Sequence, residues 1–227
     1  MKFTTPNKTF LNLDNIKIIF WDFDGVIKDS VSVKTDAFAE LFKPYGKMIC
    51  RKIIAHHVEN GGMSRFEKIP LYLKWSGIRY SKKKVETISS NFSDIVVNKV
   101  INSKWVPGVK NFIRNYFDKY IFIMVSATPQ SEIENITKAL RINRYFTKIY
   151  GSPISKFNII KKSIEEFDLS PNHCLMFGDA KADIEAAMNN QISFIFRRHK
   201  HNINLKINSK IKSIDNFIEI NNLFKSI

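Results

Sequence analysis

The stretch of sequence that decides the fold is Ile16-Lys-Ile-Ile-Phe-Trp21, followed directly by Asp22-Phe-Asp-Gly25. Apart from one lysine, its first six residues are β-branched or aromatic, which is typical of a buried strand. The glycine that follows indicates a turn. We therefore expect Asp22 and Asp24 to lie together at the carboxyl end of a buried strand.

Three further apolar runs have the same character: Ile121–Val125, Cys174–Phe177 and Ile192–Phe196. Helical patterns accompany them over Gly108–Phe117, Ser131–Leu140, Ser155–Phe167 and Ala182–Met188. Strands that are apolar throughout and alternate with helices predict an α/β fold, with a Rossmann-like parallel sheet and helices on both faces. In such folds the chemistry lies outside the carboxyl ends of the strands.

Residues 31–105 interrupt this alternation, because they contain helical patterns and no convincing strand. These patterns cover Val33–Phe42, Lys47–Val58, Arg65–Trp75 and Ser81–Val100. Loops longer than about 15 residues are uncommon, so the segment predicts an inserted helical subdomain. We expect an α/β core made of residues 1–30 and 106–227, with residues 31–105 inserted after the first strand. A basic, weakly patterned stretch at 197–212 precedes a short helix expected around 214–224.

The chain is strongly basic, with 36 lysines and arginines against 21 acidic residues and a formal net charge of +15. Such a charge is compatible with a polyanionic partner, which makes a nucleic-acid-binding protein one alternative. The basic residues form no long block and do not interleave with an aromatic stripe. We therefore do not expect nucleic acid as a partner and interpret the lysines as solvated surface residues.

The sequence also bears on the cellular compartment. Its two cysteines, Cys50 and Cys174, lie far apart and suit neither a disulfide framework nor a zinc site. Residues 1–10 contain no apolar signal segment, and the longest apolar runs are far shorter than the roughly 20 residues of a membrane span. We expect a cytoplasmic protein with no membrane partner. The oligomeric state is left open.

Four motifs follow one another along the chain: Asp22-Phe-Asp-Gly-Val26, Ser126, Lys156 and Gly178-Asp-Ala-Lys-Ala-Asp183. Each is weak alone, because Asp-x-Asp occurs by chance and a serine after a strand is often a turn or helix cap. As an ordered set, they resemble the haloacid dehalogenase superfamily of phosphotransferases over almost the whole chain. The insertion matches the helical cap of its phosphoglycolate phosphatase and β-phosphoglucomutase-like branch, and Trp105–Val109 is similar to the stretch that re-enters the core.

The carboxylates of these motifs suggest a metal site. A phosphomonoester and a carboxylate nucleophile are both anionic, so their approach needs a cation. Asp22, Asp179 and Asp183 offer oxygen ligands suited to Mg²⁺, with no histidine or cysteine among them. The resemblance adds the backbone carbonyl of Asp24 as a ligand. It also implies that Asp22 forms an aspartyl-phosphate and that Asp24 acts as general acid and base, with a pKa raised toward neutrality.

Other residues match the substrate-binding positions that the resemblance implies. Ser126 would donate a hydrogen bond to a phosphate oxygen, and Lys156 would neutralise the developing charge. Thr128 adds a donor or simply caps a helix. Gly61-Gly-Met-Ser-Arg65 is an interhelical turn, or else it resembles the cap loop that places Arg65 on substrate oxygens. For the adjacent His56 and His57 we favour a structural role in the helix.

These inferences lead to one expected function. We expect a Mg²⁺-dependent phosphatase that acts on a small phosphorylated metabolite, such as a sugar phosphate or a phosphoglycolate-like compound. The acid at Asp24 favours phosphoryl chemistry over dehalogenation, because a halide leaving group needs no proton. A mutase resembling β-phosphoglucomutase is the nearest alternative, but that relative has a histidine where this chain has Lys34. A catalytically silent protein with the same fold is a further alternative, which the intact motif carboxylates argue against.

Overall fold

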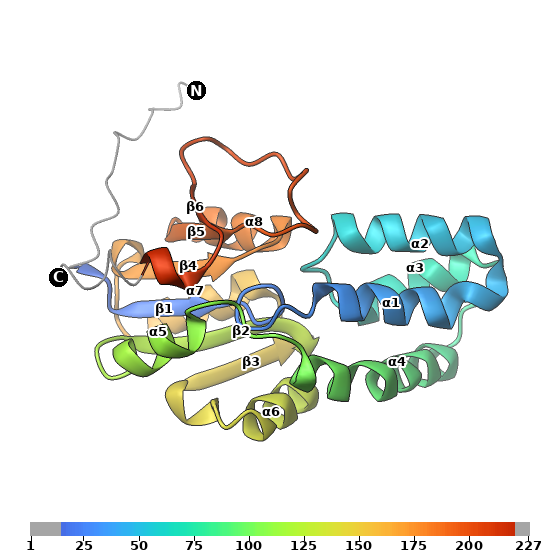
Figure 1. The fold of residues 1–227 in the computed structure, drawn as a ribbon, viewed down its shortest axis with the longest axis horizontal. Helices are drawn as coiled ribbons and strands as arrows, with labels where there is room; N and C mark the ends of the chain where they lie inside the picture. The colour runs from blue at the N-terminus through green and yellow to red at the C-terminus, as the bar shows by residue number, and fades with distance from the viewer. Residues whose placement is uncertain (1–14, 221–227) are drawn as a thin grey trace.

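The computed structural model describes residues 15–220 and contains one parallel sheet of six strands (Figure 1). The strands are β1 (Ile18–Trp21), β2 (Ile121–Pro129), β3 (Lys148–Ser152), β4 (Cys174–Gly178), β5 (Ser193–Arg197) and β6 (Lys212–Ile214). Their order in the sheet is β3-β2-β1-β4-β5-β6. The first strand of the chain therefore lies between the second and the fourth, which brings its carboxyl end to the middle of the sheet edge. The predicted α/β class is confirmed.

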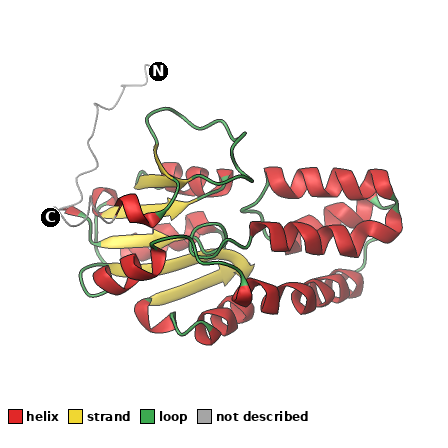
Figure 2. Cartoon of the chain, in the orientation of Figure 1, coloured by secondary structure: helices red, strands yellow, loops and turns green. Residues whose placement is uncertain are grey.

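Helices cover both faces of this sheet (Figure 2). They are α1 (Val31–Phe42), α2 (Lys47–Glu59), α3 (Arg65–Trp75), α4 (Lys82–Asn102), α5 (Val109–Tyr116), α6 (Gln130–Ala139), α7 (Lys156–Glu166) and α8 (Lys181–Asn189). Apolar residues of α5 and α6 pack on one face, and those of α7 and α8 pack on the other. Alternate residues of β1 follow the same division, since Ile19 and Trp21 join the first cluster while Ile18 and Phe20 join the second. Burial on both faces explains why the strand is apolar throughout.

The insertion after β1 forms a group of four helices, α1 to α4, beyond one end of the sheet (Figure 1). Phe38 of α1 packs at the centre of this group. The centroid of its ring lies 4.4 Å from that of Phe92 and 5.2 Å from that of Tyr72. The chain leaves and re-enters the core along paired segments, because Lys28 forms a β-bridge with Trp105. The insertion has the character of a helical cap. The division into a core of residues 1–30 and 106–227 and a cap of 31–105 stays a prediction.

The sequence missed two strands, β3 and β6, at the two edges of the sheet. β3 is mostly half-buried and β6 has three residues, so neither shows a long apolar run. The helix expected at 214–224 starts later, because Ile214 ends β6 and the helical residues begin at 217. Residues 221–224 of that prediction lie outside the described residues, and so does the segment 1–10. Within residues 15–220, no helix is long and apolar enough to cross a membrane.

Candidate active site

Three aspartates converge at the carboxyl ends of β1 and β4. Asp22 follows β1, and its backbone N–H donates to the carbonyl of Phe177 at 3.0 Å. Asp179 follows β4, and Asp183 lies in the first turn of α8. One carboxylate oxygen from each of the three lies within 4.8 Å of the others, and all three residues are buried. The predicted convergence of these carboxylates is confirmed.

Lys156 links two of these carboxylates from the first residue of α7. Its Nζ lies 2.8 Å from Asp22 Oδ1 and 2.5 Å from Asp183 Oδ1. The other oxygen of Asp183 accepts hydrogen bonds from the backbone N–H groups of Asp179 at 3.1 Å and Ala180 at 3.0 Å. Both oxygens of Asp183 are therefore engaged by protein donors. These contacts of Asp183 orient Lys156 and the turn that carries Asp179. Direct metal ligation by Asp183 stays a prediction.

The electrostatics of the cluster favour a bound cation. Burial raises the pKa of Asp22 to about 6 against the opposing effect of Lys156. Burial, together with the charges of Asp22 and Asp183, also raises the pKa of Asp179 well above its ordinary value. One lysine does not compensate three crowded carboxylates. A hard divalent cation with oxygen ligands fits this donor set, and histidine and cysteine are absent from the three-residue group.

Asp24 points its carboxylate toward the cap. It accepts hydrogen bonds from Ser30 Oγ at 2.7 Å and Thr128 Oγ1 at 3.1 Å, and it forms a short ion pair with Lys34 of α1. Burial alone would raise the pKa of Asp24, but the charge and hydrogen bond of Lys34, together with the two hydroxyl donors, lower it. The expectation of a raised pKa is therefore wrong for this arrangement, because it did not include the cap lysine.

The remaining predicted phosphate-binding residues lie at the end of β2. Ser126 is buried, and its hydroxyl oxygen accepts the backbone N–H of Thr128 at 3.1 Å. Thr128 contacts Asp24 and also accepts a hydrogen bond from Lys34 Nζ at 2.8 Å. β2 continues through Pro129, so Thr128 lies on a strand and does not serve as a plain helix cap. Binding of a phosphate oxygen by Ser126 stays a prediction.

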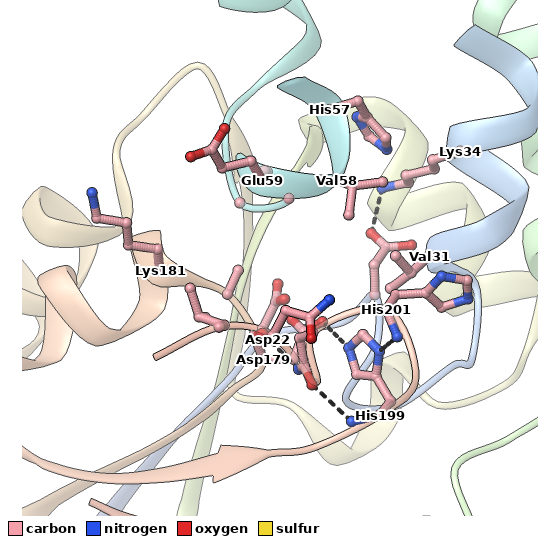
Figure 3. A pocket seen from close by; sticks show the side chains of 18 of the residues that line it. Asp22, Val31, Lys34, His57, Val58, Glu59, Asp179, Lys181, His199 and His201 are labelled. Carbon is pink, nitrogen blue, oxygen red and sulfur yellow. Dashed lines mark hydrogen bonds and ion pairs between the residues drawn. The ribbon is translucent and has the colours of Figure 1, made fainter. Parts of the chain in front are cut away.

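A cavity of about 480 Å³ lies between the carboxylates and the cap (Figure 3). Asp22, Asp179 and Lys156 line it from the core, while Lys34 and His57 line it from the cap. The Gly61–Gly62 turn reaches the core beside it, since a Cβ on Gly62 would lie 2.7 Å from the Cβ of Ala182. The cap therefore covers the strand ends at close range.

The family is shown by the sequence itself. Residues 18–196 match the model of the haloacid dehalogenase-like hydrolase family. The chain belongs to this family. The four motifs found in the sequence and the aspartate cluster described above lie within the matched residues of this haloacid dehalogenase-like hydrolase.

Individual relatives of this hydrolase are distant. It is 24% identical over 192 residues to the phosphorylated carbohydrates phosphatase of Thermotoga maritima, which covers 80% of this chain and 84% of that protein. Its fold is similar to the predicted phosphoglycolate phosphatase of Haemophilus somnus, with a TM-score of 0.72, 18% identity and coverage of 92% and 98%. It is also similar to the β-phosphoglucomutase of Clostridium difficile, with a TM-score of 0.71, 19% identity and coverage of 93% and 98%.

Arg65, expected to contact substrate, forms an ion pair with the core of this hydrolase. Its guanidinium donates to both carboxylate oxygens of Glu132 on α6, at 2.9 and 2.6 Å, and to Ser93 Oγ on α4 at 2.7 Å. The residue is buried and does not line the 480 Å³ cavity. This arrangement engages one edge of the planar guanidinium with a bidentate carboxylate partner. Contact of Arg65 with substrate stays a prediction that the observed geometry does not favour.

Sequence reasoning missed the segment that closes the far side of the site. His199 donates from Nε2 to Asp179 Oδ2 at 2.7 Å (Figure 3). Asn202 donates from Nδ2 to the Asp179 carbonyl at 2.9 Å. His201 lines the same cavity. These residues lie in the stretch 197–212, which shows no periodicity. The available signal was their place directly after an apolar strand, where parallel sheets carry functional residues.

Proposed function

We propose that the protein is a Mg²⁺-dependent phosphatase that hydrolyses a small phosphorylated metabolite, such as a sugar phosphate or a phosphoglycolate-like compound, through an aspartyl-phosphate on Asp22. The observation that carries this proposal is the convergence of Asp22, Asp179 and Lys156 at the floor of a cavity that the cap covers. The phosphorylated carbohydrates phosphatase of Thermotoga maritima supports the substrate class.

The site residues divide the work of phosphoryl transfer. A bound Mg²⁺ would be held by Asp22, Asp179 and the carbonyl of Asp24, and would supply charge neutralisation for an anionic substrate. Lys156, 2.8 Å from Asp22 Oδ1, holds the nucleophile in place and adds a second positive charge. In this scheme Asp22 attacks phosphorus while Asp24 gives a proton to the leaving oxygen. This role requires that Asp24 be protonated and therefore released from Lys34, whose contact lowers its pKa. A water molecule then passes a proton to Asp24, releases phosphate and restores Asp22.

The decisive experiment is a screen of phosphosugars, phosphoglycolate and nucleotides with Mg²⁺, read as release of inorganic phosphate. We expect hydrolysis of at least one phosphorylated small molecule by the wild type. Asp22→Asn should lower kcat by more than about 1,000-fold, because the amide keeps the shape but cannot attack phosphorus. Circular dichroism checks that the variant stays folded.

Two outcomes would contradict the proposal. Activity of Asp22→Asn within tenfold of wild type would remove Asp22 from the chemistry. Interconversion of sugar phosphates without release of inorganic phosphate would instead identify a mutase.

A further inference from the structure

A buried lysine, Lys28, joins the two chain crossings between the core and the cap. It lies on the outgoing crossing, between β1 and α1, and is 1% exposed. Its Nζ donates to the carbonyl oxygen of Ile101, in the last turn of α4, at 3.0 Å. The same Nζ lies 4.4 Å from the ring centroid of Trp105, on the crossing that returns from α4 to α5. Both crossings can be followed in Figure 1.

The charge of Lys28 is balanced without a carboxylate. Within residues 15–220 no ion pair to Lys28 is found. Burial and the charge of Lys110 lower the pKa of Lys28 to about 8, so the amine is still mostly charged near pH 7. The free carbonyl groups at the end of a helix are partly negative, and an aromatic face attracts a cation. Both kinds of partner come from the returning crossing.

This arrangement makes Lys28 sensitive to the position of α4. If the end of α4 moved away, the ammonium group would lose the Ile101 carbonyl while its surroundings stayed largely apolar. A buried charge without an acceptor is costly. Lys28 therefore favours the docked position of α4 that the structure shows.

The backbone of Lys28 belongs to the turn that carries Asp24. Its carbonyl accepts the N–H of Gly25 at 2.7 Å, and its own N–H donates to the carbonyl of Phe23 at 3.1 Å. A β-bridge pairs Lys28 with Asp24 itself. Ser30 Oγ donates to Asp24 Oδ1 at 2.7 Å and lies 3.4 Å from the Lys28 carbonyl. A displacement of Lys28 is therefore passed to Asp24 through this turn.

Asp24 has a second contact with the cap, its ion pair with Lys34 of α1. In the proposed phosphatase mechanism Asp24 carries a proton when it acts on the leaving oxygen, and a neutral carboxyl group no longer holds Lys34. The connection through Lys28 consists of main-chain hydrogen bonds and a hydrogen bond to α4, so it does not depend on the charge of Asp24. It persists in the state in which Asp24 gives its proton.

We propose that Lys28 is a positioning residue, which orients the proton-donating carboxyl group of Asp24 toward the leaving oxygen while α4 is docked. The inference rests on the proposed phosphatase function and concerns the same site. The nucleophile Asp22 is held separately by Lys156 at 2.8 Å, so its attack on phosphorus does not require Lys28. Loss of the Lys28 link therefore impairs proton donation and spares the attack itself.

The test compares two phosphomonoesters that differ in their need for a proton donor. One is the alkyl phosphate that the wild type hydrolyses fastest, and the other is 4-nitrophenyl phosphate. An alkoxide leaves only with a proton, whereas 4-nitrophenolate leaves without one. Release of the alcohol or of 4-nitrophenol is measured in a single turnover with Mg²⁺, because it precedes hydrolysis of the aspartyl-phosphate. We expect Lys28→Met to lower the alkyl rate about 10- to 100-fold and the aryl rate less than about threefold.

Lys110→Met is the matched control, because Lys110 is exposed and its Nζ lies 4.8 Å from the centroid of the same Trp105 ring. It should keep both rates. Lys28→Met replaces a buried ammonium group by an uncharged side chain of similar length, so the urea midpoint of unfolding should be unchanged or higher. Lys28→Gln, which is uncharged and one atom shorter, repeats the measurement. A residue that served only stability would lower the midpoint and both rates alike.

The outcomes separate the inference from the function on which it rests. Equal loss of both rates, or loss of neither, would overturn the positioning role of Lys28 and leave the phosphatase function standing. Unfolding of both Lys28 variants under the assay conditions would show that the residue serves the fold, and would overturn the positioning role as well. Failure of the wild type to hydrolyse any phosphomonoester would overturn the proposed function itself.

Discussion

At the residue scale, Asp179 is held in place by hydrogen bonds from His199 to its carboxylate and from Asn202 to its backbone carbonyl. Burial and the charge of Arg197 hold the pKa of His199 at about 4, so its ring is neutral near pH 7. Its Nδ1 accepts the backbone N–H of His201 at 3.2 Å, which places the ring proton on Nε2, facing Asp179. Gly25 has φ of 82° and leaves room for this carboxylate, since a Cβ there would lie 2.2 Å from Asp179 Oδ2. His199 therefore orients a predicted metal ligand.

His199→Ala should weaken Mg²⁺ binding about 10- to 100-fold, as loss of a hydrogen bond to a metal ligand commonly does. Calorimetric titration of the metal-free protein with Mg²⁺ measures this directly. His201→Ala is the matched control, because it removes an imidazole from the same segment while keeping the backbone N–H that His199 uses. Equal Mg²⁺ affinity in wild type and His199→Ala would show that Asp179 needs no such support.

At the scale of elements, one ion pair fastens the cap to the core. Arg65 begins α3, Glu132 lies in the first turn of α6, and Ser93 of α4 bonds to both. The contact joins two cap helices to a helix that packs on the sheet. The side chain of Arg65 is 4% exposed and that of Glu132 is 15% exposed, so this is a desolvated pair. Removing one partner of such a pair leaves a buried charge without compensation.

Arg65→Met should therefore lower the free energy of unfolding by about 3 kcal/mol, measured by urea denaturation. The double variant Arg65→Met with Glu132→Gln should recover part of this loss, because it leaves no unpaired charge. If Arg65→Met instead keeps wild-type stability and raises KM for the true substrate, Arg65 contacts substrate as the sequence analysis expected.

At the scale of the whole molecule, charge is distributed unevenly. A chain with net charge +15 concentrates three buried aspartates at the sheet edge and basic groups on the cap face opposite. In the metal-free protein, Asp22 has a pKa of about 6 against an ordinary value of 3.8. A group with a raised folded pKa contributes stability below its ordinary value and loses it as the pH rises through the folded value. The carboxylate cluster thus destabilises the metal-free fold near pH 7.

Saturating Mg²⁺ should relieve this repulsion, and more strongly where the carboxylates are ionised. We expect the Mg²⁺-induced rise in Tm to be about 3–6 °C larger near pH 7.5 than near pH 5, because protons compete with the metal at the lower pH. Differential scanning calorimetry at both pH values measures this. Asp179→Asn should remove most of the difference. A rise in Tm that does not depend on pH would contradict the proposed competition.

The sequence by itself determined the four central strands of the sheet, most of the helices and the position of the chemistry. Two central strands, Ile18–Trp21 and Cys174–Gly178, are buried on both faces. Their residues are therefore apolar in succession, and this pattern predicts a strand from the sequence. The motif aspartates follow these strands directly, and parallel strands bring their carboxyl ends to one edge. β3 and β6 escaped detection because edge strands with partial exposure lack that local pattern.

Only the tertiary structure decided which partners the charged residues take. Lys34 pairs with Asp24 across 10 residues, His199 with Asp179 across 20, and Arg65 with Glu132 across 67. The two partners of each pair lie in different segments of the fold, so no local periodicity identifies the pair. A lysine, histidine or arginine looks the same in sequence whether it is solvated or buried against a carboxylate. The packing of the cap and of residues 198–211 around the sheet edge makes that choice, because burial removes water as the competing partner.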